Sequence, residues 1–200
     1  MENDLYSYPL KFEFKIAALS PQFSVTDNNL NQIAYIKQKL FKLKEDVTVF
    51  QDNTMTNELY KIKANQWLDW SASYAMTDAS GESIGRIARK GGRSLFKAQY
   101  EIFDENDNHD LTINELSFVT RLLDGIMVQI PIVNMLSGLL FNPKYSITRP
   151  DGTQVALFAK NPSIMGRRFN VLKKTDFQSG EEQRIVLGLM MMVLLERRRG

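Results

Sequence analysis

The last stretch of the chain, Glu181 to Gly200, limits the possible folds more than any other part of the sequence. Between Ile185 and Leu195 every residue is apolar except Gly188. A helix that is apolar on all faces must be enclosed by protein or lipid, and this run is shorter than the roughly 20 apolar residues that a membrane span needs. We therefore predict a central helix at about 181–198, surrounded by the rest of the protein.

The charges at the two ends of this stretch support a helix. Glu181 and Glu182 stand where a helix N-terminus favours acidic residues, and the basic run 197–199 stands where a C-terminus favours basic ones. Ser179 is in the N-cap position, with Glu182 three residues later as in a capping box. The sequence thus sets the start and the end of the helix.

The rest of the chain is dominated by strand patterns. Apolar and charged residues alternate from Leu10 to Ile16, which indicates a half-buried strand. From residue 23 onward, apolar segments come in pairs around polar turns, and the aspartates of the first four turns recur about every 26 residues. These turn residues are Asp27, Asp52, Asp78 and Asp104, and a fifth pair surrounds Pro150-Asp151-Gly152.

Each repeated unit is typical of a β-hairpin, and together with the flanking segments the units predict about twelve strands. A sheet of that size must close or stack to remove its edges. We predict a mainly β protein: a closed antiparallel barrel of repeated hairpins, with the buried C-terminal helix in its lumen. The methionines at 190–192 suit such a filler, because Met adapts to irregular space.

One region interrupts the hairpins. Residues 115–123 place Leu116, Val119 and Leu122 at helical spacing, so we predict a short helical insertion near 115–140. The apolar run 126–141 could also be a membrane span, but Pro131 and its polar neighbours favour a short buried segment or a cover over one barrel end.

Composition and the first residues of the chain indicate the domain boundaries, the chemistry to exclude and the cellular compartment. We expect residues 1–9 to be flexible and residues 10–200 to form one domain. The chain has no cysteine and a net charge of +2, which excludes disulfides and thiolate chemistry and does not suggest nucleic acid binding. The start lacks a signal-peptide pattern, so we expect a cytoplasmic protein that could associate peripherally with a membrane.

Several stretches resemble a known family. They are 94–104, 130–145, 149–153 and 194–200, and the likeness spans most of the chain from Phe12 onward. With about twelve strands around an apolar C-terminal helix, the chain resembles the tubby-like C-terminal domain superfamily, with the LURP-one-related proteins and phospholipid scramblases, and its uncharacterised bacterial members most closely. The bacterial pattern has an acidic pair and Asn-Pro after Ile113, where this chain has residues 114–117 of different sequence.

The resemblance implies a fold first and a ligand second. Tubby domains bind phosphoinositide headgroups through basic residues on the barrel surface. Scramblases add a membrane segment and cysteines, which this chain lacks, so phospholipid scrambling is not expected here. No headgroup-binding residue of the family can be placed on a specific position of this sequence.

The residues themselves offer a basic candidate site. Arginines and lysines accompany two glycine-containing turns, and guanidinium groups beside flexible turns suit phosphate. The candidates for headgroup binding are Arg86, Arg89, Lys90, Arg93, Lys97, Arg167 and Arg168. The alternative interpretation is an ordinary solvated face.

Residues 104–115 offer a calcium candidate. Oxygen ligands occur with the spacing of a calcium-binding loop at Asp104, Asn106, Asn108, Asp110 and Glu115. Against calcium, His109 stands where such a loop needs glycine, and Asp104 is in register with the hairpin turns. We therefore favour no metal site and expect no cofactor.

No catalytic constellation is present in the sequence. The best hypothesis is a non-enzymatic domain that binds anionic phospholipid at a membrane surface. A protein-interaction scaffold with unknown protein partners and no lipid ligand is the alternative, and calcium binding through the 104–115 loop is the third.

Overall fold

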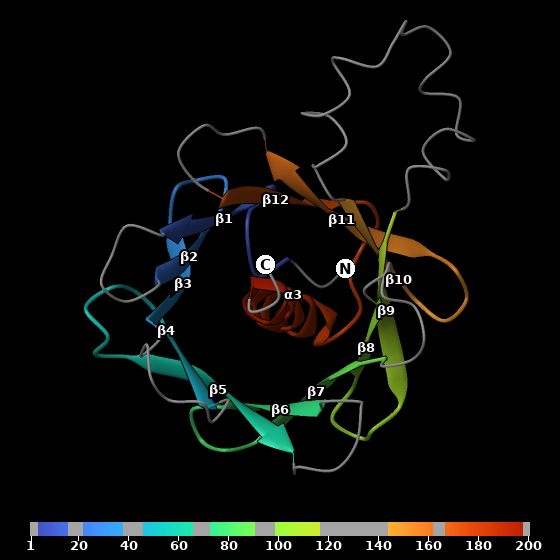
Figure 1. Ribbon diagram of the computed structural model, residues 1–200, viewed down its shortest axis with the longest axis horizontal. Coiled ribbons are helices and arrows are strands. Elements are labelled where there is room, and N and C mark those ends of the chain that lie inside the picture. Colours follow the sequence, from blue (N-terminus) through green and yellow to red (C-terminus); the bar gives the residue numbers. More distant parts are fainter. Residues whose placement is uncertain are drawn as a thin grey trace, which may run out of the picture.

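The structure, a computed structural model, describes residues 4–15, 22–37, 46–65, 73–90, 99–116, 144–161 and 167–197. These residues form a ring of strands and one helix (Figure 1). The elements are β1 (Leu10–Lys15), β2 (Gln22–Thr26), β3 (Gln32–Lys37), β4 (Asp46–Phe50), β5 (Glu58–Asn65), β6 (Ser73–Asp78), β7 (Ser83–Arg89), β8 (Gln99–Phe103), β9 (His109–Glu115), β10 (Lys144–Thr148), β11 (Gln154–Asn161), β12 (Arg167–Lys173) and α3 (Glu181–Arg197).

The strands form a closed barrel in which each strand pairs with its sequence neighbours and β1 also pairs with β12. Every pairing is antiparallel, and closure removes the free edges that a large open sheet would expose. The seam between β3 and β4 is the thinnest, with Tyr35 opposite Phe50 as its aligned pair among the described residues. The predicted twelve-stranded antiparallel barrel is confirmed.

Alternation of apolar and polar side chains explains which face of each strand points inward. In β1, Phe12 and Phe14 are buried while Lys11 is exposed, because successive side chains of a strand point to opposite faces. The same pattern buries Tyr74 and Met76 in β6. The inward faces of all the strands therefore form one continuous apolar surface around the lumen.

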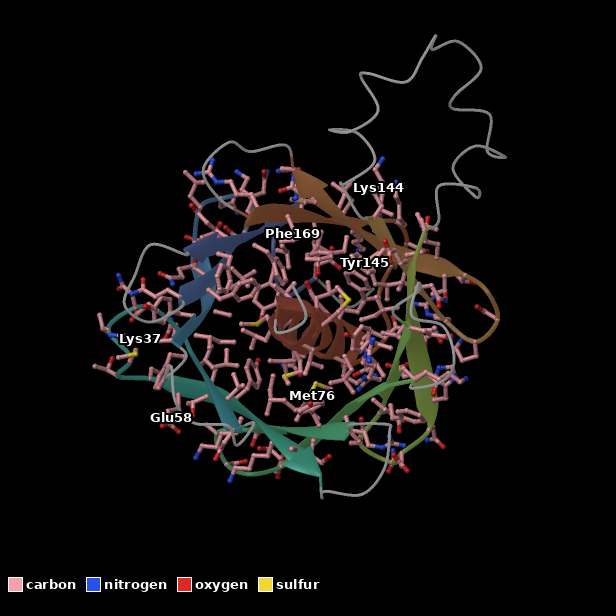
Figure 2. All side chains as sticks on the ribbon, viewed as in Figure 1. Lys37, Glu58, Met76, Lys144, Tyr145 and Phe169 are labelled. Carbon is pink, nitrogen blue, oxygen red and sulfur yellow. The ribbon has the colours of Figure 1, made fainter. Side chains whose placement is uncertain are left out.

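Helix α3 fills that lumen, as predicted (Figure 1). Ile185, Leu189 and Met190 have no exposed surface, and Met76 points from the wall toward the helix in Figure 2. At Gly188 the helix packs against the wall, where an added Cβ would come within 2.6 Å of Ile102 Cδ1. A larger residue there would force the Ile102 side chain to shift.

Five hairpin turns share one design. They join β2 to β3, β4 to β5, β6 to β7, β8 to β9 and β10 to β11, so antiparallel pairing places all five at the same end of the barrel. Each hairpin contains a register shift, and each turn has a left-handed residue three positions after its first, the geometry of a turn followed by a bulge. The left-handed residues are Leu30, Met55, Gly81, Asp107 and Gly152.

The repeated aspartates have a direct structural role in these turns. Asp104 Oδ1 accepts hydrogen bonds from the backbone N–H groups of Asn106 and Asn108 at 2.9 and 2.8 Å. Asp78 Oδ1 accepts equivalent bonds from Ser80 and Glu82. The side chain thus satisfies turn donors that have no strand partner, which explains the repeat in the sequence.

The predicted helical insertion and the N-terminal segment both lie at the edges of the described regions. Glu115, the first residue of the predicted helical insertion, is the last residue of strand β9, and residues 117–143 lie outside the described residues. At the N-terminus, the backbone N–H groups of Leu5 and Tyr6 donate to the Glu182 carboxylate at 2.7 and 3.3 Å. The opening segment therefore contacts the start of the helix.

Replacing Met191, which is 2 % exposed, tests the position of the helix. Met191→Asp places an isolated charge in an apolar lumen, which costs several kcal/mol, on the order of the whole stability of a domain. We expect no cooperative urea transition for this variant by circular dichroism. Met191→Leu, which conserves volume, should lose less than about 1.5 kcal/mol. Equal stability of the two variants would contradict an enclosed helix.

Candidate functional site

The two ends of the barrel differ in chemistry. One end carries the five hairpin turns and the N-terminus of α3, and we refer to it as the turn end. At this end the buried carboxylate of Glu181 accepts two bonds from the Arg149 guanidinium, Nε to Oε1 and Nη2 to Oε2, both 2.7 Å. Glu181 Oε2 also accepts from the backbone N–H of Gln178 at 2.7 Å. This pair connects the fifth hairpin turn to the first residue of the helix.

Arg184 makes a second connection one turn further along the helix. Its Nε donates to Asp110 Oδ2 at 2.7 Å and its Nη1 to Glu105 Oε2 at 3.1 Å. A third bond runs from Nη2 to the carbonyl of Ser179 at 3.1 Å. Because Arg184 and Asp110 are both largely buried, burial raises the pKa of the Asp110 carboxyl, and the hydrogen bond from Arg184 opposes that rise.

Beside Arg184 a shallow pocket of about 230 Å³ opens at the turn end. Three carboxylates lie in its lining, on Asp78, Glu82 and Glu105, against the single guanidinium of Arg184. That guanidinium is already paired with two carboxylates. The pocket would therefore repel a phosphate group, and it is unsuited to the anionic ligand that the sequence suggests.

Acidic residues predominate over the whole turn end. The basic residues described there are Lys11, Arg149, Lys173, Lys174 and Arg184. The acidic residues of the turns, the N-terminal segment and the helix start are Asp4, Asp27, Asp52, Glu58, Asp78, Glu82, Asp104, Glu105, Asp107, Asp110, Asp151, Asp176, Glu181 and Glu182. Glu181 and Glu182 lie at the positive end of the helix dipole, which stabilises their charge.

The opposite end carries the reverse charge. We define the basic rim as the described basic side chains at the strand ends on this side, namely Lys37, Lys63, Arg89, Lys90, Lys144, Lys160 and Arg168. All are exposed or half-buried. The acidic side chains described within three residues of the same strand ends are Glu13, Asp46, Glu101 and Glu115, of which Glu13 pairs with Arg168 and Glu101 with Lys90. Among the described residues, acidic side chains therefore predominate at the turn end and basic ones at the strand ends of the rim.

The structure separates the predicted headgroup residues into groups. Arg89 ends β7 and Lys90 follows it, while Arg168 is the second residue of β12. All three belong to the basic rim, although these two strands lie on nearly opposite sides of the barrel. Lys90 pairs with Glu101 at 2.6 Å, and Arg168 pairs with Glu13 at 3.3 Å.

The other predicted headgroup residues lie elsewhere or are not described. Arg86 sits on the wall of the barrel, paired with Asp107 and stacked on Phe103 with 3.6 Å from Cζ to the ring centre. Arg93 and Lys97 lie outside the described residues, and for Arg167 the structure describes the backbone only. The described side chains among them, Arg86, Arg89, Lys90 and Arg168, do not form one compact patch.

Sequence reasoning missed part of the rim. Lys37, Lys63, Lys144 and Lys160 are far apart in the chain and share only their position at strand ends on one side of the barrel. The sequence did contain a usable pattern, because lysine or arginine recurs near the ends of odd-numbered strands and near the starts of even-numbered ones. Recognising this pattern requires accurate strand ends, which the sequence does not provide.

The calcium candidates occupy a hairpin and not a helix–loop–helix. The Asp104 carboxylate is used within its own turn, with Oδ2 also accepting from Asn108 Nδ2 at 3.0 Å. Asp110 is bound by Arg184. Glu115 ends strand β9, about 17 Å along the strand from Asp110 at 3.3 Å per residue. The candidate ligands therefore do not converge on one point, and no cluster of three acidic, His or Cys side chains able to hold a metal occurs in the described part of the chain.

Comparison with known proteins accounts for this architecture. Residues 32–171 match the family described as LURP-one-related. The chain belongs to the LURP-one-related family. This family is part of the tubby-like C-terminal superfamily, in agreement with the barrel around a C-terminal helix. None of the curated proteins compared with the sequence matches it. Within the described ranges, no helix of this LURP-one-related domain has the length and apolar character needed to cross a bilayer.

The Arg149–Glu181 pair gives a stability prediction. Arg149→Met leaves the Glu181 carboxylate, which has no exposed surface, without its charged partner, and breaking a buried pair in this way costs about 3–5 kcal/mol. The double variant Arg149→Met/Glu181→Leu buries no unpaired charge and should recover part of that loss. Urea unfolding of the three proteins measures both effects. A double variant less stable than Arg149→Met would contradict the assignment.

The turn aspartates give a pH prediction. The hydrogen bond from the Asn108 side chain, with those from the turn backbone, holds the pKa of Asp104 below its ordinary value of about 3.9. A lowered pKa contributes stability that is present above pH ~4 and is lost as the pH falls further. Asp104→Asn should therefore lower the urea midpoint at pH 7 and have a smaller effect at pH 3.

The equivalent aspartate in the β6–β7 turn provides a repeat of this test. The Ser80 hydroxyl lowers the pKa of Asp78 in the same way, so Asp78→Asn should show the same pH dependence. A loss of stability that is the same at both pH values, for both variants, would argue against the turn bonds as the cause.

Proposed function

We propose that this LURP-one-related domain binds anionic phospholipid headgroups, phosphoinositides included, at a membrane surface. The observation that supports the proposal is the separation of charge between the basic rim and the turn end. Lys63, Lys90 and Lys144 are exposed on the rim. Each basic residue held near an anionic membrane contributes about 1 kcal/mol. A rim of this kind supplies several such contributions at once.

The small net charge of +2 does not weaken this proposal. Helix α3 has 17 residues, so it spans about 25 Å between the two ends at 1.5 Å per residue. At physiological ionic strength charges are screened over about 8 Å. A membrane beside the basic rim therefore interacts with the basic charges, while the acidic turn end is screened from it.

Sedimentation with vesicles tests the proposal. The protein should pellet with vesicles that contain phosphatidylserine or a phosphoinositide and stay in the supernatant with phosphatidylcholine alone. Binding should weaken as salt is raised, since the contacts are electrostatic. Equal binding to neutral and anionic vesicles, or none to either, would contradict lipid-headgroup binding and favour a protein-interaction scaffold.

A matched pair of triple variants identifies the surface. Lys63→Gln/Lys90→Gln/Lys144→Gln removes three rim charges, which at about 1 kcal/mol each should weaken binding about a hundredfold. Lys11→Gln/Lys61→Gln/Lys174→Gln removes the same charge from the wall and the turn end, and should weaken binding less than about threefold, since screening limits the effect of distant charges. Equal losses would show that net charge, not the rim, determines binding.

A further inference from the structure

The positions of the rim residues around the barrel determine which face can meet a flat surface. Lys37 ends β3, Lys63 lies two residues before the end of β5, and Lys144 begins β10. In the closed strand order these strands are spread around the circumference. Lys37 and Lys144 accordingly lie on opposite sides of the barrel in Figure 2. Only a surface placed across the end of the barrel can approach all of them together.

The wall of the barrel lacks such an excess of one charge. On β1, Lys11 and Glu13 alternate on the outer face, and Arg86 on β7 is paired with Asp107. A membrane that touched the wall would meet charges of both signs, so the wall offers less attraction than the rim.

The turn end adds an orienting force. Its acidic side chains would be repelled by an anionic bilayer, and the basic rim would be attracted. Both forces act along the axis of α3, because the helix begins at the turn end with Glu181 and continues through the lumen of the barrel.

The spread of the rim residues around one end of the barrel also distinguishes a bilayer from a nucleic acid. A nucleic acid is a narrow strand or duplex that could contact only one arc of the rim.

We propose that the domain docks end-on: the basic rim lies on an anionic bilayer, the axis of α3 stands along the membrane normal, and the acidic turn end points into solution. This inference rests on the lipid-binding function proposed above and specifies the surface and the orientation. It assigns Lys37, Lys63, Lys144 and Lys160 to the membrane contact, together with Lys90 and Arg168.

The absence of cysteine from the sequence permits a direct test. Single cysteines can be introduced in one sector of the barrel at three exposed or half-buried alanines: Ala64 beside the rim, Ala75 on the wall and Ala79 at a turn. A fourth at Asn161 lies at the rim on β11, across the barrel. None of these substitutions changes a charge, so vesicle binding should be retained, which sedimentation of each labelled protein checks.

Each cysteine is labelled with an environment-sensitive fluorophore and mixed with vesicles containing phosphatidylserine and a lipid-borne quencher. End-on docking predicts that emission changes at least twofold and is quenched for Ala64→Cys and Asn161→Cys, and stays within a tenth of its starting value for Ala75→Cys and Ala79→Cys. High salt should reverse the change.

The other outcomes separate the orientation from the function. Changes at Ala64→Cys and Ala75→Cys without Asn161→Cys would mean side-on docking and overturn this inference while lipid binding stands. A change at Ala79→Cys would mean docking through the turn end and overturn it as well. Failure of the unlabelled protein to sediment with anionic vesicles would overturn both, and equally tight binding to a DNA oligonucleotide at the same salt would overturn the assignment to membranes.

Discussion

Packing of α3 against the inward faces of the strands is the interaction on which the rest of the structure depends. A closed barrel of this size has a lumen too wide for its own side chains to fill, and an all-apolar helix cannot remain in water. Each element therefore supplies what the other lacks. Gly188 shows how close the fit is, because an added Cβ would require the Ile102 side chain to shift.

Apolar packing alone does not determine which way the helix points, and the ion pairs at the turn end do. Arg149 holds Glu181, and Arg184 reaches Asp110 and Glu105, so the N-terminus is tied to hairpins on the same end. Desolvated charges with several partners each select one arrangement, because any other leaves a buried charge unpaired. The direction of the helix then matches its dipole to the acidic turn end and the basic rim.

Much of the fold could be predicted from the sequence because the repeats had local physical causes. The alternation of apolar and charged residues from Leu10 to Ile16 predicted which face of a strand is buried. Aspartates such as Asp78 marked the turns, because their carboxylates accept hydrogen bonds from backbone N–H groups of the turn. The apolar run after Glu181 is too short for a membrane span, which left a helix enclosed by the protein as the prediction. In the fifth hairpin the first residue of the turn is Arg149 and not an aspartate. Arg149 binds Glu181, which is distant in the sequence, so no local pattern reveals why the residue differs.

The candidate site was less predictable because it is assembled by closure. Arg89 and Lys90 were identified from their shared sequence neighbourhood, and they do lie on the basic rim. Lys37 and Lys144 are separated by most of the domain and come onto the same rim only through strand direction. Residues 104–115 offered only a disfavoured calcium candidate, and the strand from His109 onward spreads those residues along the wall.

Native-state hydrogen exchange measures the central claim, the enclosure of α3 by the barrel, most directly. If the barrel cannot stand without its helix, the amides of residues 185–194 should exchange only by global unfolding, with protection equal to the free energy of unfolding from urea titration. Exchange of these amides at a free energy clearly below that of the inner strands β6 to β9 would mean that the helix leaves an intact barrel, and would contradict the account.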